Sequence, residues 1–190
     1  MSMLRKVYQH PTFTENDYQK IEDAHTKVSV KKNDHFLKAG EVCKTYYCLE
    51  NGLARGYVTD QKGNEITTGF YGKHEIVIEV VSLFQQVPAK ENLQAVTDSV
   101  CWKIDFERFQ DIFHTIEAFP EWGRSWMAQN LFACKLRSIS MITDSATDRY
   151  LALQKQYPEI IQQAPLKYIA TYLGITDTSL SRIRRNLSKK

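Results

Sequence analysis

The first half of the chain alternates apolar and polar residues in short runs that are separated by glycine and other turn residues. Between Val28 and Asp105 these runs are rich in β-branched and aromatic side chains, which favour strands. Asn51-Gly52 is typical of a tight turn, because both residues tolerate a positive φ. Short strands separated by turns predict a sandwich or a barrel. The candidate strands are Val28–Lys32, Thr45–Glu50, Leu53–Asp60, Glu65–Tyr71, Ile76–Val80, Glu91–Thr97 and Val100–Ile104.

After Asp105 the spacing of apolar residues becomes helical. Asp105 is placed to cap a helix that carries Phe109 and Ile112 on one side. A longer helix is expected after Pro120, because the segment from Glu121 to about Thr143 holds no proline. A helix of this size is about 30 Å long.

The apolar residues of this long helix, among them Trp122, Trp126 and Leu136, spread over a wide arc. A face this broad needs cover on more than one side, so a neighbouring domain and a second subunit are both expected. Gln129 and Ser140 interrupt the heptad seam. A long helix buried within one chain is therefore the alternative to a dimer helix.

Two further helices are marked by capping residues. Thr14 with Asp17 resembles a capping box that opens a helix over Glu15–His25. Asp144 is expected to cap a helix over Ser145–Gln156, which ends before a proline.

Residues 165–185 have the spacing of a helix-turn-helix. Ala170 is small where two helices would cross closely, and Gly174 follows where the chain must turn sharply. Thr176 can cap the second helix. In that helix the apolar residues recur at i, i+3 and i+7, as Leu180, Ile183 and Leu187.

With this apolar stripe facing inward, polar and basic side chains of the second helix face outward. Arg182 suits the O6 and N7 atoms of guanine, and Arg185 lies nearer the phosphates. The N-terminus of the helix can also donate backbone N–H groups to a phosphate. The predicted DNA-binding residues are Lys167, Thr176, Asp177, Thr178, Ser179, Ser181, Arg182 and Arg185.

The distribution of charge agrees with this prediction. The 190 residues carry a formal net charge of +3, which by itself points to no partner. Residues 167–190 hold six basic residues against Asp177 alone, so their net charge is +5, while the other 166 residues hold 19 basic and 21 acidic side chains, a net charge of −2. The basic charge is concentrated on the segment expected to face DNA. A solvated helical tail that happens to be basic is the alternative.

The whole chain resembles the Crp/Fnr family of bacterial transcription regulators. The resemblance is carried by the segment YIATYLGITDTSLSRIRR and by the glycine-punctuated strands around KAGEV, ENGLARGYV and QKGNEIT. Asp148-Arg149-Tyr150 and the following YPEIIQQAPLKYIA resemble the Bacteroidetes-type branch. The resemblance implies a β-roll like that of cyclic-nucleotide-binding domains, a long dimer helix and a winged helix-turn-helix. Little chain follows Leu187 for a wing hairpin, so its phosphate contacts are expected to be either missing or replaced by Lys189 and Lys190.

The sensor region departs from the pattern of nucleotide-binding members of that family. Such a member carries a Gly-Glu pair and, about ten residues later, an Arg followed by Ser or Thr; the Arg neutralises the cyclic phosphate. Here Glu79 matches the glutamate without a preceding glycine, and Ala89-Lys90 stands where Arg-Ser would be. Lys90 cannot make the planar two-pronged contact of arginine. The effector pocket at Glu79, Ala89 and Lys90 is therefore not expected to bind cyclic AMP, and the effector is unknown.

The sequence gives little support for a metal, haem or enzyme active site. The four cysteines (Cys43, Cys48, Cys101 and Cys134) are not spaced for zinc or for an N-terminal iron–sulfur cluster. His35, His74 and His114 have no context that marks a haem ligand. A cupin-type β-barrel enzyme with a helical tail is the main rival, but only His74-Glu75 approaches its metal-ligand pattern. A sensor that acts only by protein contact is a third hypothesis.

The sequence thus predicts an α+β chain in three parts. Residues 1–119 form a jelly-roll sensor domain with flanking helices, residues 120–143 the dimerisation helix, and residues 144–190 a winged-helix-like helix-turn-helix domain. An effector on the β-roll would act through a hinge near Met141–Asp144. We expect no catalytic residues, no metal and no cofactor. The expected partners are double-stranded DNA, a second copy, RNA polymerase and an unidentified small effector. Because no apolar run approaches the ~20 residues of a membrane span and the start lacks a secretory signal, a cytoplasmic location is expected.

Overall fold

The computed structural model describes residues 2–188. Two helices come first, α1 (Met3–Val7) and α2 (Glu15–Ala24). The predicted capping box opens α2: the Thr14 hydroxyl accepts from the Asp17 N–H at 3.2 Å, and the Asp17 carboxylate accepts from the Thr14 N–H at 2.9 Å. No helix within residues 2–188 is long and apolar enough to cross a membrane.

Eight strands then form two four-stranded antiparallel sheets, which make up the β-roll. One sheet has the order β1-β8-β3-β6 and the other the order β2-β7-β4-β5. The strands are β1 (Thr26–Val30), β2 (His35–Leu37), β3 (Thr45–Asn51), β4 (Ala54–Thr59), β5 (Glu65–Tyr71), β6 (Ile76–Val77), β7 (Asn92–Ala95) and β8 (Ser99–Asp105).

The turn predicted at Asn51-Gly52 is present, and the backbone of Gly52 lies close to Asp98 and Ser99. Gly52 has φ +103°, and a Cβ at this position would lie 2.4 Å from the Ser99 hydroxyl and 2.8 Å from the Asp98 carbonyl oxygen. Only glycine fits both the backbone conformation and the space. The turn therefore fixes how β3 and β4 enter their two sheets.

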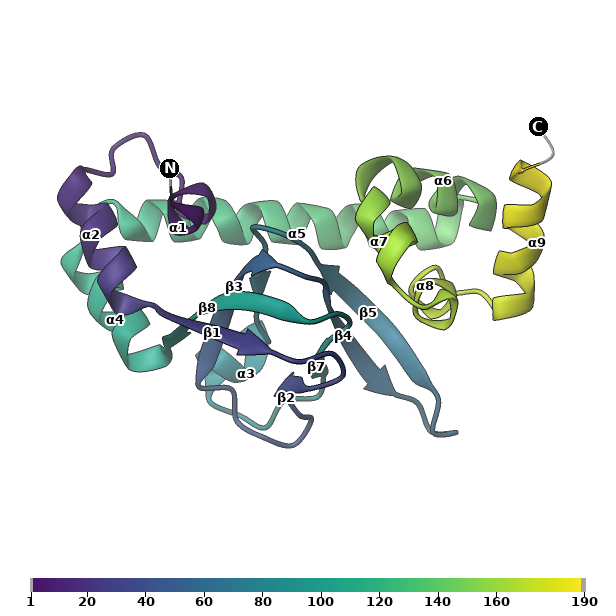
Figure 1. Cartoon of the computed structure of the whole chain (residues 1–190), viewed down its shortest axis with the longest axis horizontal. Helices are drawn as coiled ribbons and strands as arrows, with labels where there is room; N and C mark the ends of the chain where they lie inside the picture. The colour runs from purple at the N-terminus through teal and green to yellow at the C-terminus, as the bar shows by residue number, and fades with distance from the viewer. Residues whose placement is uncertain (1, 189–190) are drawn as a thin grey trace.

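The remaining helices follow from residue 80 onward. They are α3 (Val80–Gln85), α4 (Phe106–Thr115), α5 (Phe119–Thr143), α6 (Ala146–Gln156), α7 (Pro158–Gln163), α8 (Leu166–Tyr172) and α9 (Asp177–Leu187). Figure 1 shows α5 running along the length of the molecule, with the strands on one side of it and α6–α9 at its C-terminal end.

Two apolar clusters hold this arrangement together. The larger fills the β-roll and extends to α1, α2, α4 and the first turns of α5. The smaller fills the space among α6–α9 and includes Leu53 and Val96 from the β-roll, with Phe70 packed against it. The C-terminal helices are thus packed against the β-roll as well as joined to α5.

Three sequence-based expectations were wrong at the ends of elements. Asp105 precedes α4 but makes no capping hydrogen bond; its carboxylate pairs with Lys103 at 3.0 Å. Asp144 accepts from Ser140 at the end of α5, and Ser145 caps α6 instead. The strand expected at Ile76–Val80 ends at Val77, and α3 begins at its last residue.

Candidate functional site

The turn between α8 and α9 has a shape that the sequence explains. Gly174 has φ +68°, and a Cβ there would lie 2.5 Å from the Cε atom of Met141. The Thr176 hydroxyl accepts a hydrogen bond from the Ser179 N–H at 3.2 Å and thereby caps α9. Glycine and threonine therefore fix the angle at which α9 leaves α8.

Arg149 of α6 fastens this turn to the end of α5. Its Nη2 atom donates to the Leu173 carbonyl oxygen at 3.0 Å, and its Nη1 atom donates to the Asp144 carbonyl oxygen at 2.6 Å. These two carbonyls lie at helix C-termini, where a cation is favourable. The segment predicted to be a hinge is thus held by a bidentate arginine.

Helix α9 buries one side and exposes the other. Leu180 and Ala170 are fully buried against each other's helices, while Ile183 and Leu187 are half-buried. Seven of the eight residues predicted to contact DNA lie exposed: Lys167, Thr176, Asp177, Thr178, Ser181, Arg182 and Arg185.

Two of the predicted residues, Thr176 and Ser179, take part in the N-terminal cap of α9. The hydroxyl of the half-buried Ser179 lies 3.0 Å from the hydroxyl of Thr176, which already accepts from the backbone. Both residues therefore stabilise the N-terminus of α9. Lys189 and Lys190, expected to touch phosphates, lie outside the described residues.

A groove of about 510 Å³ with a mixed polar and apolar lining runs between α9 and the start of α6. Arg182 and Asn186 line it from α9, and Thr147 lines it from α6. Neither Asn186 nor Thr147 is among the predicted DNA-binding residues. Asn186 follows Arg182 by four residues, so the helical spacing places both on the same side of α9 and Asn186 could have been predicted. Thr147 could not, because its position in the groove depends on how α6 packs against α9.

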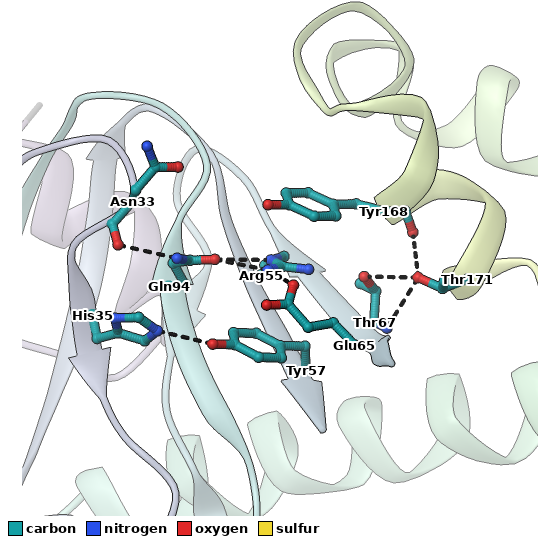
Figure 2. A network of polar contacts seen from close by, with 9 residues as sticks. All are labelled: Asn33, His35, Arg55, Tyr57, Glu65, Thr67, Gln94, Tyr168 and Thr171. Atoms are coloured by element: carbon teal, nitrogen blue, oxygen red, sulfur yellow. Dashed lines mark hydrogen bonds and ion pairs between the residues drawn. The ribbon is translucent and has the colours of Figure 1, made fainter. Parts of the chain in front are cut away.

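A polar network joins the β-roll to α8 (Figure 2). Arg55 of β4 is only 1% exposed, and its Nη2 atom donates to Gln94 at 2.8 Å and to Glu65 at 2.5 Å. Its guanidinium carbon lies 4.1 Å from the centre of the Tyr57 ring and 3.4 Å from that of Tyr168. Arg55 is therefore stacked between a ring of the β-roll and a ring of α8.

A second contact lies beside this arginine. The Thr171 hydroxyl of α8 accepts from the Thr67 N–H at 3.2 Å and lies 3.1 Å from the Thr67 hydroxyl. Thr67 is buried in β5. Together the two contacts fix α8 on the outer face of the β4–β5 hairpin, and neither was predicted from the sequence.

The three residues of the predicted effector pocket have separate surroundings. The Glu79 carboxylate accepts from the Ser82 N–H at 2.5 Å and so caps α3. Ala89 is buried, with its N–H donating to the Glu41 carbonyl oxygen at 2.8 Å. Lys90 is exposed. The positions matching the Arg-Ser pair thus hold a small buried side chain and an outward cation.

Glu91, which the sequence analysis passed over, brings a carboxylate to the inner face of the β-roll. It accepts a hydrogen bond from the Thr68 hydroxyl, and a Cβ on Gly56 would lie 2.8 Å from its carboxyl carbon. Burial raises the pKa of the Glu91 carboxyl, as does the charge of Glu79, while the bond from Thr68 lowers it. Two neighbouring carboxylates make this region unfavourable for an anion.

The three residues assigned to the dimer helix also differ in exposure. Trp122 is 7% exposed and packs on Tyr8 with 4.6 Å between ring centroids, so it belongs to the core of its own chain. Trp126 is half-buried, and Leu136 is 66% exposed. Its own chain therefore covers Trp122, while Leu136 lies exposed. That these residues belong to a dimer helix stays a prediction.

Comparison with known proteins identifies the β-roll. Residues 27–115 match the model of the cyclic nucleotide-binding domain family. No curated protein matches the chain.

Solved structures resemble the chain over most of its length. The c-di-GMP responsive global regulator CLP of Xanthomonas campestris is 17% identical, with 93% of this chain and 92% of that one covered and a TM-score of 0.70. FixK2 of Bradyrhizobium japonicum is 15% identical, with 87% and 85% covered and a TM-score of 0.71. A transcriptional regulator of the Crp/Fnr family from Eubacterium rectale, described as putative, is 17% identical, with 93% and 84% covered and a TM-score of 0.70.

These likenesses extend beyond the β-roll to the long helix and the C-terminal helices, since they cover at least 87% of this chain. Over residues 27–115 the chain matches the cyclic nucleotide-binding domain family, and as a whole it has the fold of the Crp/Fnr transcription regulators.

Proposed function

We propose that this chain is a sequence-specific transcription regulator that binds double-stranded DNA as a homodimer in the cytoplasm. The observation that carries the proposal is the exposed polar row on α9, from Asp177 to Arg185, opposite the fully buried Leu180. The role is one of binding and not of catalysis. On the segment Asp148–Tyr150 we also place the chain in the Bacteroidetes-type branch of the Crp/Fnr family.

The geometry of α8 and α9 suits the major groove. α9 has 11 residues, a capped N-terminus and an apolar stripe turned toward α8, so the opposite side is free to meet base edges. Arg182 can make a bidentate contact with guanine, and Ser181 and Thr178 are short enough to reach other base edges. Arg185 and Lys167 would meet phosphates, and such contacts fix the register and orientation of the protein on the duplex.

The homodimer is supported by the apolar surface of α5. Large apolar side chains that are scattered singly need no partner, but a row of them along one helix is typical of an interface. The exposed apolar residues of α5 are Met127, Leu131, Phe132, Leu136, Ile139, Met141 and Ile142. Two paired α5 helices would present two α9 helices to half-sites about 34 Å apart. RNA polymerase would be the next partner of such a complex.

Substitution of Arg182 tests the proposal. The operator is first recovered by sequencing genomic DNA fragments bound to the chain. Arg182→Ala should then weaken operator binding by about 1–3 kcal/mol and relax base preference at one position of each half-site. Arg108→Ala removes the same charge from an exposed site on α4 and should leave affinity unchanged. An equal loss on operator and random duplexes would make Arg182 a phosphate contact instead.

We further propose that the β-roll does not take a cyclic nucleotide. Ala89 provides no guanidinium for the phosphate, and the carboxylates of Glu79 and Glu91 would repel it. Calorimetry with cyclic AMP and cyclic GMP should give no binding heat at millimolar ligand. Binding of either nucleotide at micromolar concentration would contradict this assignment while leaving the DNA-binding proposal intact.

A further inference from the structure

An apolar cavity of about 320 Å³ lies where the start of α5 meets α4 and the β-roll. Aromatic rings from four elements line it: Tyr46 of β3, Phe84 of α3, Phe113 of α4, and Trp122 and Trp126 of α5. Its volume is at the lower end of the ~300–1,000 Å³ typical of small-molecule pockets. Glu79, Ala89 and Lys90 are not among its lining residues, so it is separate from the position of a cyclic nucleotide.

A glycine keeps this cavity open. Gly123 lies in the second turn of α5 and lines the cavity, although glycine is among the poorest helix formers. Its φ is not positive, and the nearest heavy atom to a Cβ at this position would be an atom of Phe113, 4.0 Å away. Neither backbone conformation nor a close approach requires glycine here. Its effect is to leave space that a larger side chain would fill.

The mouth of the cavity carries a cation. Arg124 is the residue with a formal charge among those that line the cavity. Its partner is Glu121, with Nε–Oε2 at 3.0 Å, and their side chains are 71% and 50% exposed. An exposed pair of this kind is weak. A ligand carboxylate at the mouth could therefore replace Glu121 on the guanidinium.

We propose that this cavity binds a small aromatic carboxylate, with its ring system among the aromatic side chains and its carboxylate on Arg124. Edge-to-face and offset contacts with several rings favour an aromatic ligand over an aliphatic one. The neighbouring rings are already arranged in this way, as with Phe84 and Phe109 at 5.9 Å and 75°. The proposal does not rest on DNA binding, although Met127 lines the cavity and is also one of the exposed α5 residues assigned to the dimer interface.

Calorimetry on the full chain tests the site with 2-naphthoate and, as an uncharged probe, 2-naphthalenemethanol. We expect 2-naphthoate to bind with Kd on the order of 100 µM. Arg124→Gln should weaken 2-naphthoate about tenfold and leave the alcohol within about twofold. Gly123→Leu should fill the cavity and weaken both probes by about 20-fold or more.

Matched controls separate filling of the cavity from loss of the fold. Gln129→Leu adds the same side chain to an exposed site on the same helix and should leave both probes unaffected. Thermal unfolding of Gly123→Leu should give a Tm no lower than that of the unmodified chain, because leucine is the better helix former.

Three results would overturn the proposal. They are the absence of binding heat with 2-naphthoate at millimolar concentration, unchanged affinity in Gly123→Leu, and an equal loss of both probes in Arg124→Gln. No binding of either probe, together with a dimer that Gly123→Leu dissociates in sedimentation, would show that a second copy fills the cavity instead.

Discussion

Arg55 shows how one residue can join two parts of this molecule. It follows Ala54 on β4, and alternation turns its side chain to the outer face of the sheet, where an arginine is ordinarily solvated. Here α8 covers that face and leaves the side chain 1% exposed, stacked on Tyr168. Its Nη1 atom has no hydrogen-bond partner within the described residues, so the rings on either side are its main contacts there.

We expect Arg55→Lys to destabilise the chain by about 2 kcal/mol. Lysine keeps the charge, but it lacks the planar group that stacks between Tyr57 and Tyr168 and bonds Gln94. The free energy of unfolding in urea measures the loss, and hydrogen exchange should show the amides of α8 opening more readily. Tyr168→Phe keeps the ring and serves as the control. If Arg55→Lys is as stable as the unmodified chain, the stacking contributes little.

The residues of the candidate site fall into two groups: local sequence spacing determines the positions of some, and contacts with distant segments determine the positions of the others. The outward face of α9 follows from the spacing of Leu180, Ile183 and Leu187, so its exposure could be predicted. Glu91 and Arg55 could not, because each acquires its role from a segment distant in sequence: Thr68 for one and Tyr168 for the other. The packing of Trp122 on Tyr8 could not be predicted either, because a helical pattern shows which residues are apolar but not which neighbour covers them.

At the scale of elements, the helices and strands that were predicted correctly are those marked by the spacing of apolar residues or by a capping residue. The strand Glu65–Tyr71 has the expected bounds, and α2 opens at its capping box. The elements missed are short: β2 has 3 residues, α1 has 5, and α3 and α7 have 6 each, too few for a period to be recognised.

The end of α5 shows how competing caps mislead a prediction. Asp144 and Ser145 are both good N-cap residues, and only one can begin α6. The Asp144 carboxylate accepts from the hydroxyls of Ser140 and Thr143 on the helix it follows, at 2.6 and 2.8 Å. Ser145 then has Asp148 three residues ahead, and its hydroxyl accepts from that residue's N–H at 3.2 Å.

At the scale of the whole molecule, the proposed ligand cavity and the proposed DNA-binding helix lie at opposite ends of α5. The aromatic cavity lies at its start. Helix α9 lies beyond its end (Figure 1). The C-terminal helices are held by Arg149, by the Arg55 stack and by the apolar cluster around Leu53 and Val96. A signal from the β-roll would therefore pass through a packed contact and not through a free hinge.

The most direct test of the central claim is the salt dependence of binding to an operator-bearing duplex. Because lysine and arginine displace counterions from phosphates, the logarithm of the binding constant should fall linearly with that of salt concentration, by about 0.9 per phosphate contacted. We predict about six to ten contacts for a dimer, binding to the operator at least about 10³-fold tighter than to random duplex, and a slope about 2 units shallower in Arg185→Ala, one contact per copy. A binding constant that does not change with salt, or equal affinity for operator and random duplex, would contradict the account.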